Sequence, residues 1–338
     1  MALKLDVQLS LSLHDAEERA RALEAVGVDG VFTFENAHDV FLPLAVAARA
    51  CSLDLMTNVA IAFPRSPMHL AVLANDLHQY SEGRFRLGLG SQIKPHIEKR
   101  YGSTWHKPVA QMREWAQATK AILTSWQEGT RLDFRGEYTT HTLMTPVFDP
   151  GPNPYGMPKV LVGALGPRMT EMAAELADGV LVMPFNSGRH MEERTRPAIE
   201  RGLAAAGRRR EDIEVVAEVI VGVGRTEEEL EAAMGVRNLL AFYGSTPSYR
   251  PVLEVHGWQD VQPELNRLSK AGDWGSMAGL VTDEMVRTIA VHGTPDEAAA
   301  EIVRRYGDCD RVCAYFPFYD ATDDLVADFA AALRRASA

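Results

Sequence analysis

Two glycine-rich segments are the first sign of chemistry in this sequence. Each follows a short apolar run: the first ends in Gly88-Leu89-Gly90-Ser91-Gln92 and the second is Gly163-Ala164-Leu165-Gly166-Pro167. Glycine removes the Cβ atom where a strand meets its loop, so a flat or phosphorylated ligand can lie against the backbone. A lone glycine pair marks a tight turn or close packing more often than a site. Two similar strand ends on one parallel sheet favour a cradle for a cofactor.

One histidine lies where an acid–base group would be useful. His38 follows the predicted strand 28–34, within the segment Glu35-Asn36-Ala37-His38-Asp39. Because imidazole titrates near working pH, His38 is a candidate proton donor or acceptor for a redox cofactor. A loop histidine that caps a neighbouring helix is an equally good explanation from sequence alone.

The sequence gives little support to metal catalysis. A metal hydrolase would gather histidines and carboxylates at several strand ends, but the first predicted strand ends in Gln8-Leu9-Ser10 and the ten histidines are scattered. His69 and His78 fall within a predicted helix and are expected to be structural. No Cys-x-x-Cys or His-Glu-x-x-His motif occurs. Lys94, a few residues past a strand end, leaves open a cofactor-free lyase or aldolase that works through a Schiff base.

Composition limits the partners of this chain. Its 338 residues carry a formal net charge of −11, which argues against nucleic acid or an anionic membrane surface as partner, because both need basic patches. No run approaches about 18 uninterrupted apolar residues, and residues 1–6 contain no long apolar segment, so we expect a cytoplasmic protein. Three cysteines, Cys51, Cys309 and Cys313, imply no disulfide framework, and the last two are expected to be buried thiols.

Apolar runs and amphipathic segments alternate along the chain, which is typical of βα units. The expected strands are 3–9, 28–34, 53–63, 85–89, 159–164, 178–183, 213–223 and 311–316, and helices are expected between them. Two segments interrupt this pattern: 129–158, with a hairpin-like piece at 132–138, and an irregular region at 243–293. Eight units with about 250 residues outside the insertions predict one domain, 1–338, folded as a (β/α)8 TIM barrel with two insertions. In such barrels the active site lies at the C-terminal ends of the strands.

Five blocks, found in order between about residue 3 and residue 335, resemble the luciferase-like monooxygenase superfamily, whose barrel enzymes use FMN or the deazaflavin coenzyme F420. The fourth-strand block, with Gln92 to Glu98, resembles an actinobacterial subgroup expected to use the deazaflavin. The blocks are GVDGVFTFENAHDVFLPLAVAA, NVAIAFPRSP, SEGRFRLGLGSQIKPHIEKRYG, VLVGALGPRMTEMAAELADGV and HGTPDEAAAEIV.

The resemblance implies a set of cofactor-binding residues. Asn58, Val59 and Ala60 match the place where members have a non-proline cis peptide behind the cofactor ring. The loop from Gly163 to Arg168 matches the one whose backbone N–H groups and helix N-terminus hold the cofactor phosphate. Its members here are Gly163, Ala164, Leu165, Gly166, Pro167 and Arg168, and Gly90, Ser91 and Gln92 belong to the same predicted cradle.

The resemblance also bears on catalysis, and here the chain departs from the pattern. His38 matches a histidine that lies near the reactive ring carbon in some deazaflavin members. Certain members carry a catalytic glutamate just after the fourth-strand glycines, where this sequence has Ile93. Either Glu35 or Glu98 takes its place, or the reaction differs from that of the sugar-phosphate dehydrogenases.

The predicted function is an oxidoreductase that moves a hydride between F420, or alternatively FMN, and a small organic substrate. The alternatives are a coenzyme-binding barrel without turnover, an FMN-dependent monooxygenase, and the Lys94 lyase. We also expect a homodimer or a higher homo-oligomer.

Overall fold

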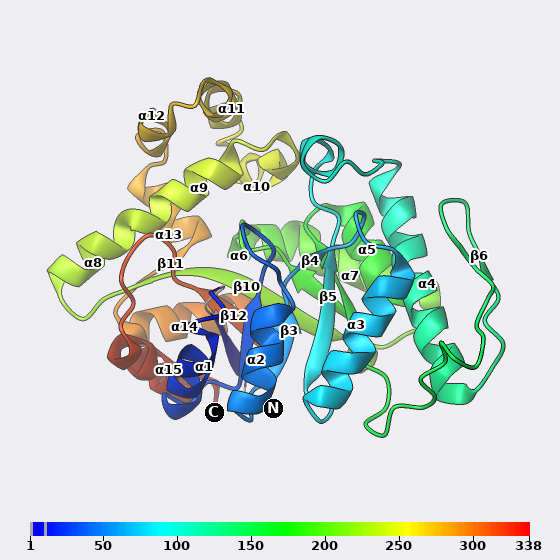
Figure 1. Cartoon of the computed structure of the whole chain (residues 1–338). Helices are drawn as coiled ribbons and strands as arrows, with labels where there is room; N and C mark the ends of the chain where they lie inside the picture. Colours follow the sequence, from blue (N-terminus) through cyan, green and yellow to red (C-terminus); the bar gives the residue numbers. More distant parts are fainter. Residues whose placement is uncertain (1–2, 10–11) are drawn as a thin grey trace.

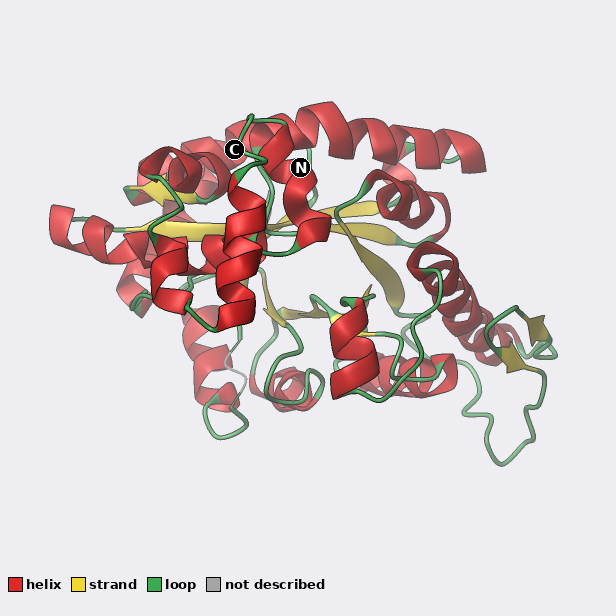
Figure 2. Ribbon diagram, turned by 90° about the horizontal axis from the view of Figure 1, so that it is seen from above, coloured by secondary structure: helices red, strands yellow, loops and turns green. Residues whose placement is uncertain are grey.

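The apolar runs form a closed parallel barrel, seen from above in Figure 2. The computed structural model describes residues 3–9 and 12–338. The strands follow one another in the order β10-β12-β1-β2-β3-β5-β8-β9, and β9 pairs again with β10 to close the ring. The predicted TIM barrel is therefore confirmed. The barrel strands are β1 (Lys4–Gln8), β2 (Gly30–Thr33), β3 (Asp54–Thr57), β5 (Phe85–Gly90), β8 (Lys159–Ala164), β9 (Gly179–Val182), β10 (Glu214–Val223) and β12 (Arg311–Tyr315).

Helices cover the outside of the barrel (Figure 1). Their starts follow local sequence signals: Thr294 and Glu297 form a capping box at α14, and proline occupies the first turn of α2, α3, α4, α5 and α14. In the described residues no helix is long and apolar enough to cross a membrane. The outer helices are α1 (Ala16–Ala25), α2 (Leu42–Ala50), α3 (Pro67–Tyr80), α4 (Pro108–Glu128), α5 (Pro167–Leu176), α6 (Gly188–His190), α7 (Arg196–Ala206), α14 (Pro295–Tyr306) and α15 (Asp323–Ser337).

Some local predictions need adjustment. The expected strand 53–63 is two strands, β3 and β4 (Ala60–Ile61), with a cis peptide between Asn58 and Val59. Ser10, in the predicted end of the first strand, lies outside the described residues. Cys309 and Cys313 are buried free thiols, as predicted. His78 is also structural, since it is buried and its Nδ1 donates to the Phe85 carbonyl oxygen at 3.0 Å.

The first insertion is a small antiparallel hairpin, β6 (Phe134–Arg135) with β7 (Thr140–His141). Glu114, a buried carboxylate on α4, holds it to the barrel by accepting the backbone N–H groups of Glu137, Tyr138 and Thr139. A Cβ atom on Gly136 would meet this carboxylate at 2.1 Å, so the chain needs glycine at that turn.

The second insertion is helical, so the expectation of an irregular region over 243–293 is wrong. Its glycines and prolines lie at helix boundaries: Gly244 is the last residue of α9, Pro247 begins a short 3-10 turn, and Gly272 ends α11 with φ of 73°. The helices have their own apolar core and lie above the strands in Figure 1. They are α8 (Glu227–Ala233), α9 (Arg237–Gly244), α10 (Arg250–Glu254), α11 (Val261–Ala271), α12 (Trp274–Ala278) and α13 (Asp283–Ile289), followed by β11 (Val291–Gly293).

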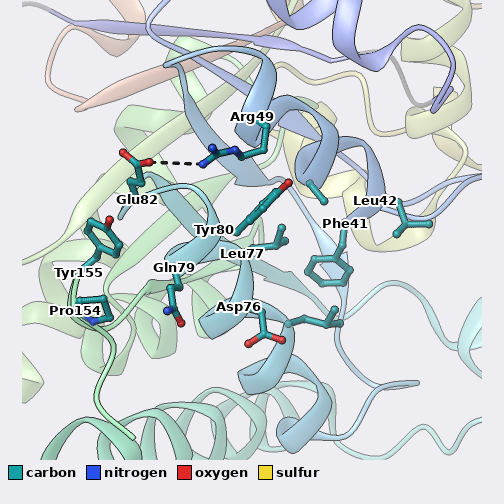
Figure 3. A pocket seen from close by; sticks show the side chains of 12 residues that line it. Phe41, Leu42, Arg49, Asp76, Leu77, Gln79, Tyr80, Glu82, Pro154 and Tyr155 are labelled. Carbon is teal, nitrogen blue, oxygen red and sulfur yellow. Dashed lines mark ion pairs between the residues drawn. The ribbon is translucent and has the colours of Figure 1, made fainter. Parts of the chain in front are cut away.

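A large hollow lies on the outside of the barrel. This groove, of about 710 Å³, runs between α2, α3 and the loop of Pro154 and Tyr155 (Figure 3). Its wall is largely apolar, with an ion pair between Arg49 and Glu82 at 3.6 Å. The groove contains none of the predicted site residues.

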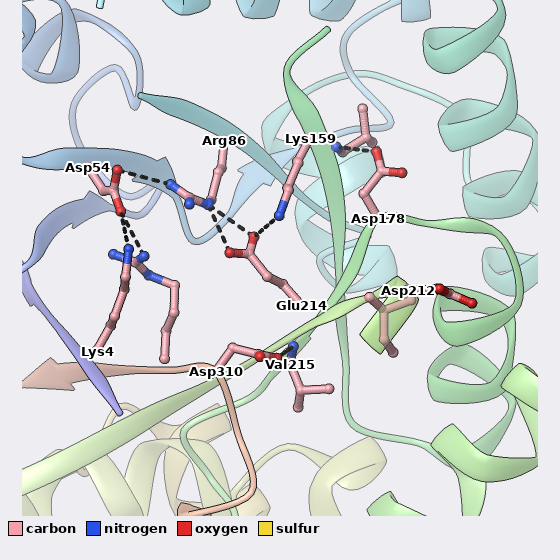
Figure 4. A network of polar contacts seen from close by, with 12 residues as sticks. Lys4, Asp54, Arg86, Lys159, Asp178, Asp212, Glu214, Val215 and Asp310 are labelled. Atoms are coloured by element: carbon pink, nitrogen blue, oxygen red, sulfur yellow. Dashed lines mark hydrogen bonds and ion pairs between the residues drawn. The ribbon is translucent and has the colours of Figure 1, made fainter. Parts of the chain in front are cut away.

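The N-terminal end of the barrel interior is filled by paired charges (Figure 4). Arg311, only 1 % exposed, donates from Nε to Asp6 Oδ2 at 2.7 Å and from Nη1 to Asp54 Oδ2 at 2.8 Å. Arg86 bonds Glu214 at 3.0 Å, and Lys159 lies 3.3 Å from the same carboxylate. Burial alone would raise the pKa values of Asp54 and Glu214, but the neighbouring cations outweigh it and leave both lowered.

Arg311→Met should destabilise the fold, because it leaves the buried Asp6 without its cation and removes one of the cations that face the partly exposed Asp54. Breaking a buried pair in this way costs about 3–5 kcal/mol. Lys4→Met is the matched control, since Lys4 approaches the same Asp54 at 3.4 Å but is half exposed and should cost only about 0–1 kcal/mol. Urea unfolding of both variants measures the difference. Equal losses would mean that the interior pairing contributes no more than a surface pair.

Candidate functional site

The C-terminal end of the barrel interior differs from the charged end. Below it, an apolar layer fills the middle of the barrel and consists of Phe32, Met56, Leu161, Leu181, Val216 and Cys313. Side chains alternate along a strand, so the next inward positions include Phe34, Asn58, Glu218 and Tyr315. We call these four residues the C-terminal layer. The rings of Phe34 and Tyr315 meet edge to face, with centroids 5.4 Å apart.

Glu218 is the one carboxyl residue among these four. It lies in the middle of β10 and is only 8 % exposed. In the part of the chain that the structure describes, no side chain or backbone group donates a hydrogen bond to it. Burial raises the pKa of Glu218 to about 8, so the carboxyl is largely protonated at neutral pH.

The second insertion brings two tyrosines to this layer. Tyr243 of α9 and Tyr249 of the following turn pack on Phe185, with centroids 6.1 and 6.3 Å away. Burial and, next, the charge of Glu218 raise the pKa of Tyr249 to about 12 and that of Tyr315 to about 12. The same two causes raise the pKa of Tyr243 further. Residues 243–293 contain four tyrosine and tryptophan residues, and two of them, Tyr243 and Tyr249, therefore reach the barrel.

The other two aromatic residues do not. Trp258 stacks on His256 within the insertion, at 4.6 Å between centroids, and Trp274 is exposed beside Phe242.

The glycines of β5 and β8 allow Thr57 and Val59 to pack closely against these strands. A Cβ atom on Gly90 would lie 2.2 Å from Val59 Cγ2, and one on Gly163 would lie 3.1 Å from Val59 Cγ1. A Cβ atom on Gly88 would lie 2.0 Å from the Thr57 carbonyl oxygen. The expectation that these glycines expose backbone to a ligand is therefore not met at Gly88 and Gly90. The assignment of Gly90 and Gly163 to cofactor binding stays a prediction.

Residues around the cis peptide are held firmly. Asn58 is 5 % exposed, and its backbone N–H donates to the Thr33 carbonyl at 2.7 Å. Its side-chain Nδ2 is buried and has no partner among the described residues. Ala60 is fully buried where β4 pairs with β5. The orphaned amide is a donor available to a ligand in the C-terminal layer.

The loop after β8 provides open space. Gly166 is the N-cap of α5, and a Cβ atom there would have no heavy atom within 4 Å. Pro167 and Arg168 follow in the exposed first turn, while Ala164 is buried and Leu165 packs at the edge of the insertion core. This segment has the free backbone N–H groups and the space that an anion needs.

The two predicted catalytic residues have different surroundings. The Glu35 carboxylate is 7 % exposed and accepts three hydrogen bonds, from Ile61 N at 2.8 Å, Arg65 Nη1 at 2.6 Å and the Tyr101 hydroxyl at 3.0 Å. With its oxygens occupied, Glu35 is arranged to hold β4 and the segment around Tyr101 in place. His38 lies in the exposed loop before α2, and within residues 3–9 and 12–338 its one hydrogen bond runs from its backbone N–H to Asn36 Oδ1 at 3.3 Å.

The residues that follow β5 bond to one another. Ser91 bonds the Gln92 carbonyl, and Gln92 adopts φ of 56° while its side chain accepts the Ile93 N–H at 3.0 Å. Glu98 and Lys94 form an exposed pair at 3.7 Å. A Schiff-base lysine needs a desolvated setting, so the exposure of Lys94 weighs against the lyase alternative.

Two signals for this site were not used in the sequence analysis. A single glutamate interrupts an otherwise apolar run in VVAEVIVGV, which indicates Glu218, and Tyr315 ends the last strand. Among the described residues, no group of three or more His, Cys, Asp or Glu could hold a metal ion.

The sequence profile of the family described as luciferase-like monooxygenase matches residues 4–309. The chain belongs to this family. It is 50% identical over 317 residues to an uncharacterized protein of Mycobacterium tuberculosis, covering 93% of each chain. It is 30% identical over 301 residues to a 5,10-methylenetetrahydromethanopterin reductase of Archaeoglobus fulgidus, covering 86% of each.

Solved structures show the same fold. The coenzyme F420-dependent tetrahydromethanopterin reductase of Methanopyrus kandleri superposes with a TM-score of 0.83 at 21% identity, over 100% of both chains. The oxygenating component of 3,6-diketocamphane monooxygenase from Pseudomonas putida, in complex with FMN, gives 0.66 at 17% identity, over 99% of this chain and 97% of that one. Enzymes of this fold thus include both F420- and FMN-dependent members.

Gly90→Ala should destabilise the protein by about 1–3 kcal/mol, because the added methyl group overlaps Val59. Gly166→Ala adds the same group in open space and should cost less than about 1 kcal/mol, through the poorer helix cap. Thermal unfolding of the two variants side by side tests this contrast. Equal melting temperatures would show that Val59 can move away from Gly90 at no cost.

Proposed function

We propose that this chain is an oxidoreductase that transfers a hydride between coenzyme F420 and a small organic substrate, with FMN as the alternative coenzyme. The observation that carries the proposal is the buried, unpartnered Nδ2 of Asn58, next to the cis peptide and facing a layer of aromatic and protonated groups. A flat coenzyme ring with acceptor atoms fits this environment. The family membership supports the same conclusion.

The residues present fit such a coenzyme. Asn58, Val59 and Ala60 would lie behind the ring, and Gly166 to Arg168 would receive an anionic phosphate in the open space at the start of α5. The bound coenzyme would supply the site that gives or accepts the hydride. His38, in the loop after β2, would exchange a proton on the coenzyme side, while Glu35 would keep the adjoining backbone in position.

The coenzyme preference is tested by titrating the purified protein with F420 and with FMN in parallel. We expect F420 to bind at least about tenfold tighter, a difference of about 1.4 kcal/mol. Gly166→Val should weaken the binding of either coenzyme, since its side chain occupies the space beside the α5 amides. Equal or tighter binding of FMN would favour the FMN-dependent monooxygenase. Binding of either coenzyme with no redox change under a substrate panel would favour the barrel without turnover.

His38→Asn should lower turnover by at least about 10²-fold, the lower range for removal of a positioned acid–base group. Coenzyme affinity should change little, since His38 is exposed and its side chain has no protein partner in the described structure. His69→Asn, an exposed histidine in the first turn of α3, is the matched control. Turnover per folded molecule is measured together with the melting temperature. Full activity in His38→Asn would remove His38 from the reaction.

A further inference from the structure

Glu218 is chemically unlike the other buried or partly buried carboxylates of this barrel. Asp6, Asp54 and Glu214 are paired with arginine, and Glu114 accepts three backbone N–H groups. Glu218 has no such partner among the described residues, although it is only 8% exposed. An unpaired buried carboxyl is costly to keep. Where such a group lies at the C-terminal end of a barrel, it points to function.

Polar groups around Glu218 come from separate parts of the chain. Tyr243 and Tyr249 arrive from the second insertion, with ring centroids 6.1 Å apart, and Tyr315 and Cys313 come from β12. The pKa values of these three hydroxyls and of the Cys313 thiol are all raised, mainly by burial, and Glu218 contributes to each. These neighbours are therefore neutral at pH 7. No cation contributes to the shifted pKa of Glu218, which burial alone explains.

We propose that Glu218 is a catalytic residue that exchanges a proton with the oxygen of a neutral carbonyl or alcohol substrate bound between the C-terminal layer and Tyr243 and Tyr249. The proposal rests on the proposed hydride-transfer function. It assigns the substrate side of the reaction to a residue inside the barrel, whereas His38 serves the coenzyme side from the loop after β2.

The step balances in atoms and electrons. A carbonyl carbon accepts a hydride, with its two electrons, from the reduced coenzyme, which is thereby oxidised by two electrons. The C=O π bond breaks, and its electron pair takes the proton from the Glu218 carboxylic acid. The products are the alcohol and the Glu218 carboxylate, which regains a proton from solvent. In alcohol oxidation each transfer runs in the opposite direction.

The surroundings also limit the substrate class. The C-terminal layer contains no cation, and its polar members are an amide, a hydroxyl and a protonated carboxyl. A phosphate or carboxylate on the reacting part of the substrate would find no counter-charge there and would repel Glu218 once it ionises. A neutral ketone or secondary alcohol with an apolar or aromatic body fits these residues.

The first experiment uses the coenzyme-free protein and infrared spectroscopy. At neutral pH the wild type should show the carbonyl band of a protonated carboxylic acid, and this band should disappear as the pH rises through about 8. Glu218→Gln should lack the band, whereas Glu231→Gln, an exposed carboxylate on α8, should keep it. Absence of the band from the wild type overturns the proposal. Because this spectrum is measured on the wild type, the result does not depend on whether Glu218→Gln folds.

Stability provides a second readout that needs no coenzyme. Because the folded pKa of Glu218 lies above the unfolded value of about 4.3, the protonated form stabilises the fold at low pH, and this contribution is lost as pH rises toward about 8. Glu218→Gln should therefore become more stable relative to wild type as pH increases from about 5 to 8. A constant difference would contradict a protonated Glu218.

The third experiment places a probe against the carboxyl. Acetophenone, added to the coenzyme-loaded wild type, should shift the infrared band, while benzoate should not. An unmoved band with acetophenone would overturn the contact with substrate. Coenzyme affinity of Glu218→Gln should stay within about threefold of wild type, and turnover should fall at least about 10²-fold. If no coenzyme binds the wild type, the proposed function fails. The infrared band of the coenzyme-free protein still shows whether Glu218 is protonated.

Discussion

The cost of burying charge governs how the interior of this barrel is arranged. Eight parallel strands enclose a space that side chains must fill, and at the N-terminal end this chain fills it with Arg311, Asp6, Asp54, Arg86 and Glu214. Their desolvation is offset because each carboxylate meets a guanidinium at hydrogen-bond distance or close to it. In this ring β12 lies between β1 and β10, and it places Arg311 there. An apolar layer then separates this network from the opposite end.

At the C-terminal end, the buried carboxyl of Glu218 has no ionic partner among the described residues. The cost of burying its charge is avoided because the carboxyl stays neutral. Glu218 lies in the low-dielectric interior and holds its proton, since burial raises its pKa to about 8. The second insertion contributes to this environment by packing Tyr243 and Tyr249 against Phe185. The first insertion instead packs on the outside of the barrel, because Glu114 attaches it to the outer helix α4. The two insertions therefore differ in what they add to the site.

Glycine has two opposite uses in this fold. At Gly88 and Gly90 it allows backbone and Val59 to approach within distances that any Cβ atom would forbid. At Gly166 it lies beside open space at a helix N-terminus, where an anion can approach. Gly88 and Gly90 lie at the end of β5 and Gly166 lies just after β8, so the two segments look alike in sequence. The positions of Thr57 and Val59, next to the pairing of β4 with β5, fill the space beside Gly88 and Gly90, whereas the space beside Gly166 stays open.

The sequence by itself determined the features that depend on near neighbours in the chain. The spacing of apolar residues indicated eight βα units, and Thr294 and Glu297 marked a helix start. The first insertion interrupts the pattern where it was expected, whereas the second begins earlier, at α8. These signals are local, because strand and helix periods and caps involve residues a few positions apart. The tertiary structure alone decided that Glu35 accepts hydrogen bonds from Ile61, Arg65 and Tyr101, and that Glu218 has no hydrogen-bond partner among the described residues. Hydrogen-bond pairing and burial depend on residues distant in sequence, so no local pattern can distinguish an occupied carboxylate from a reactive one.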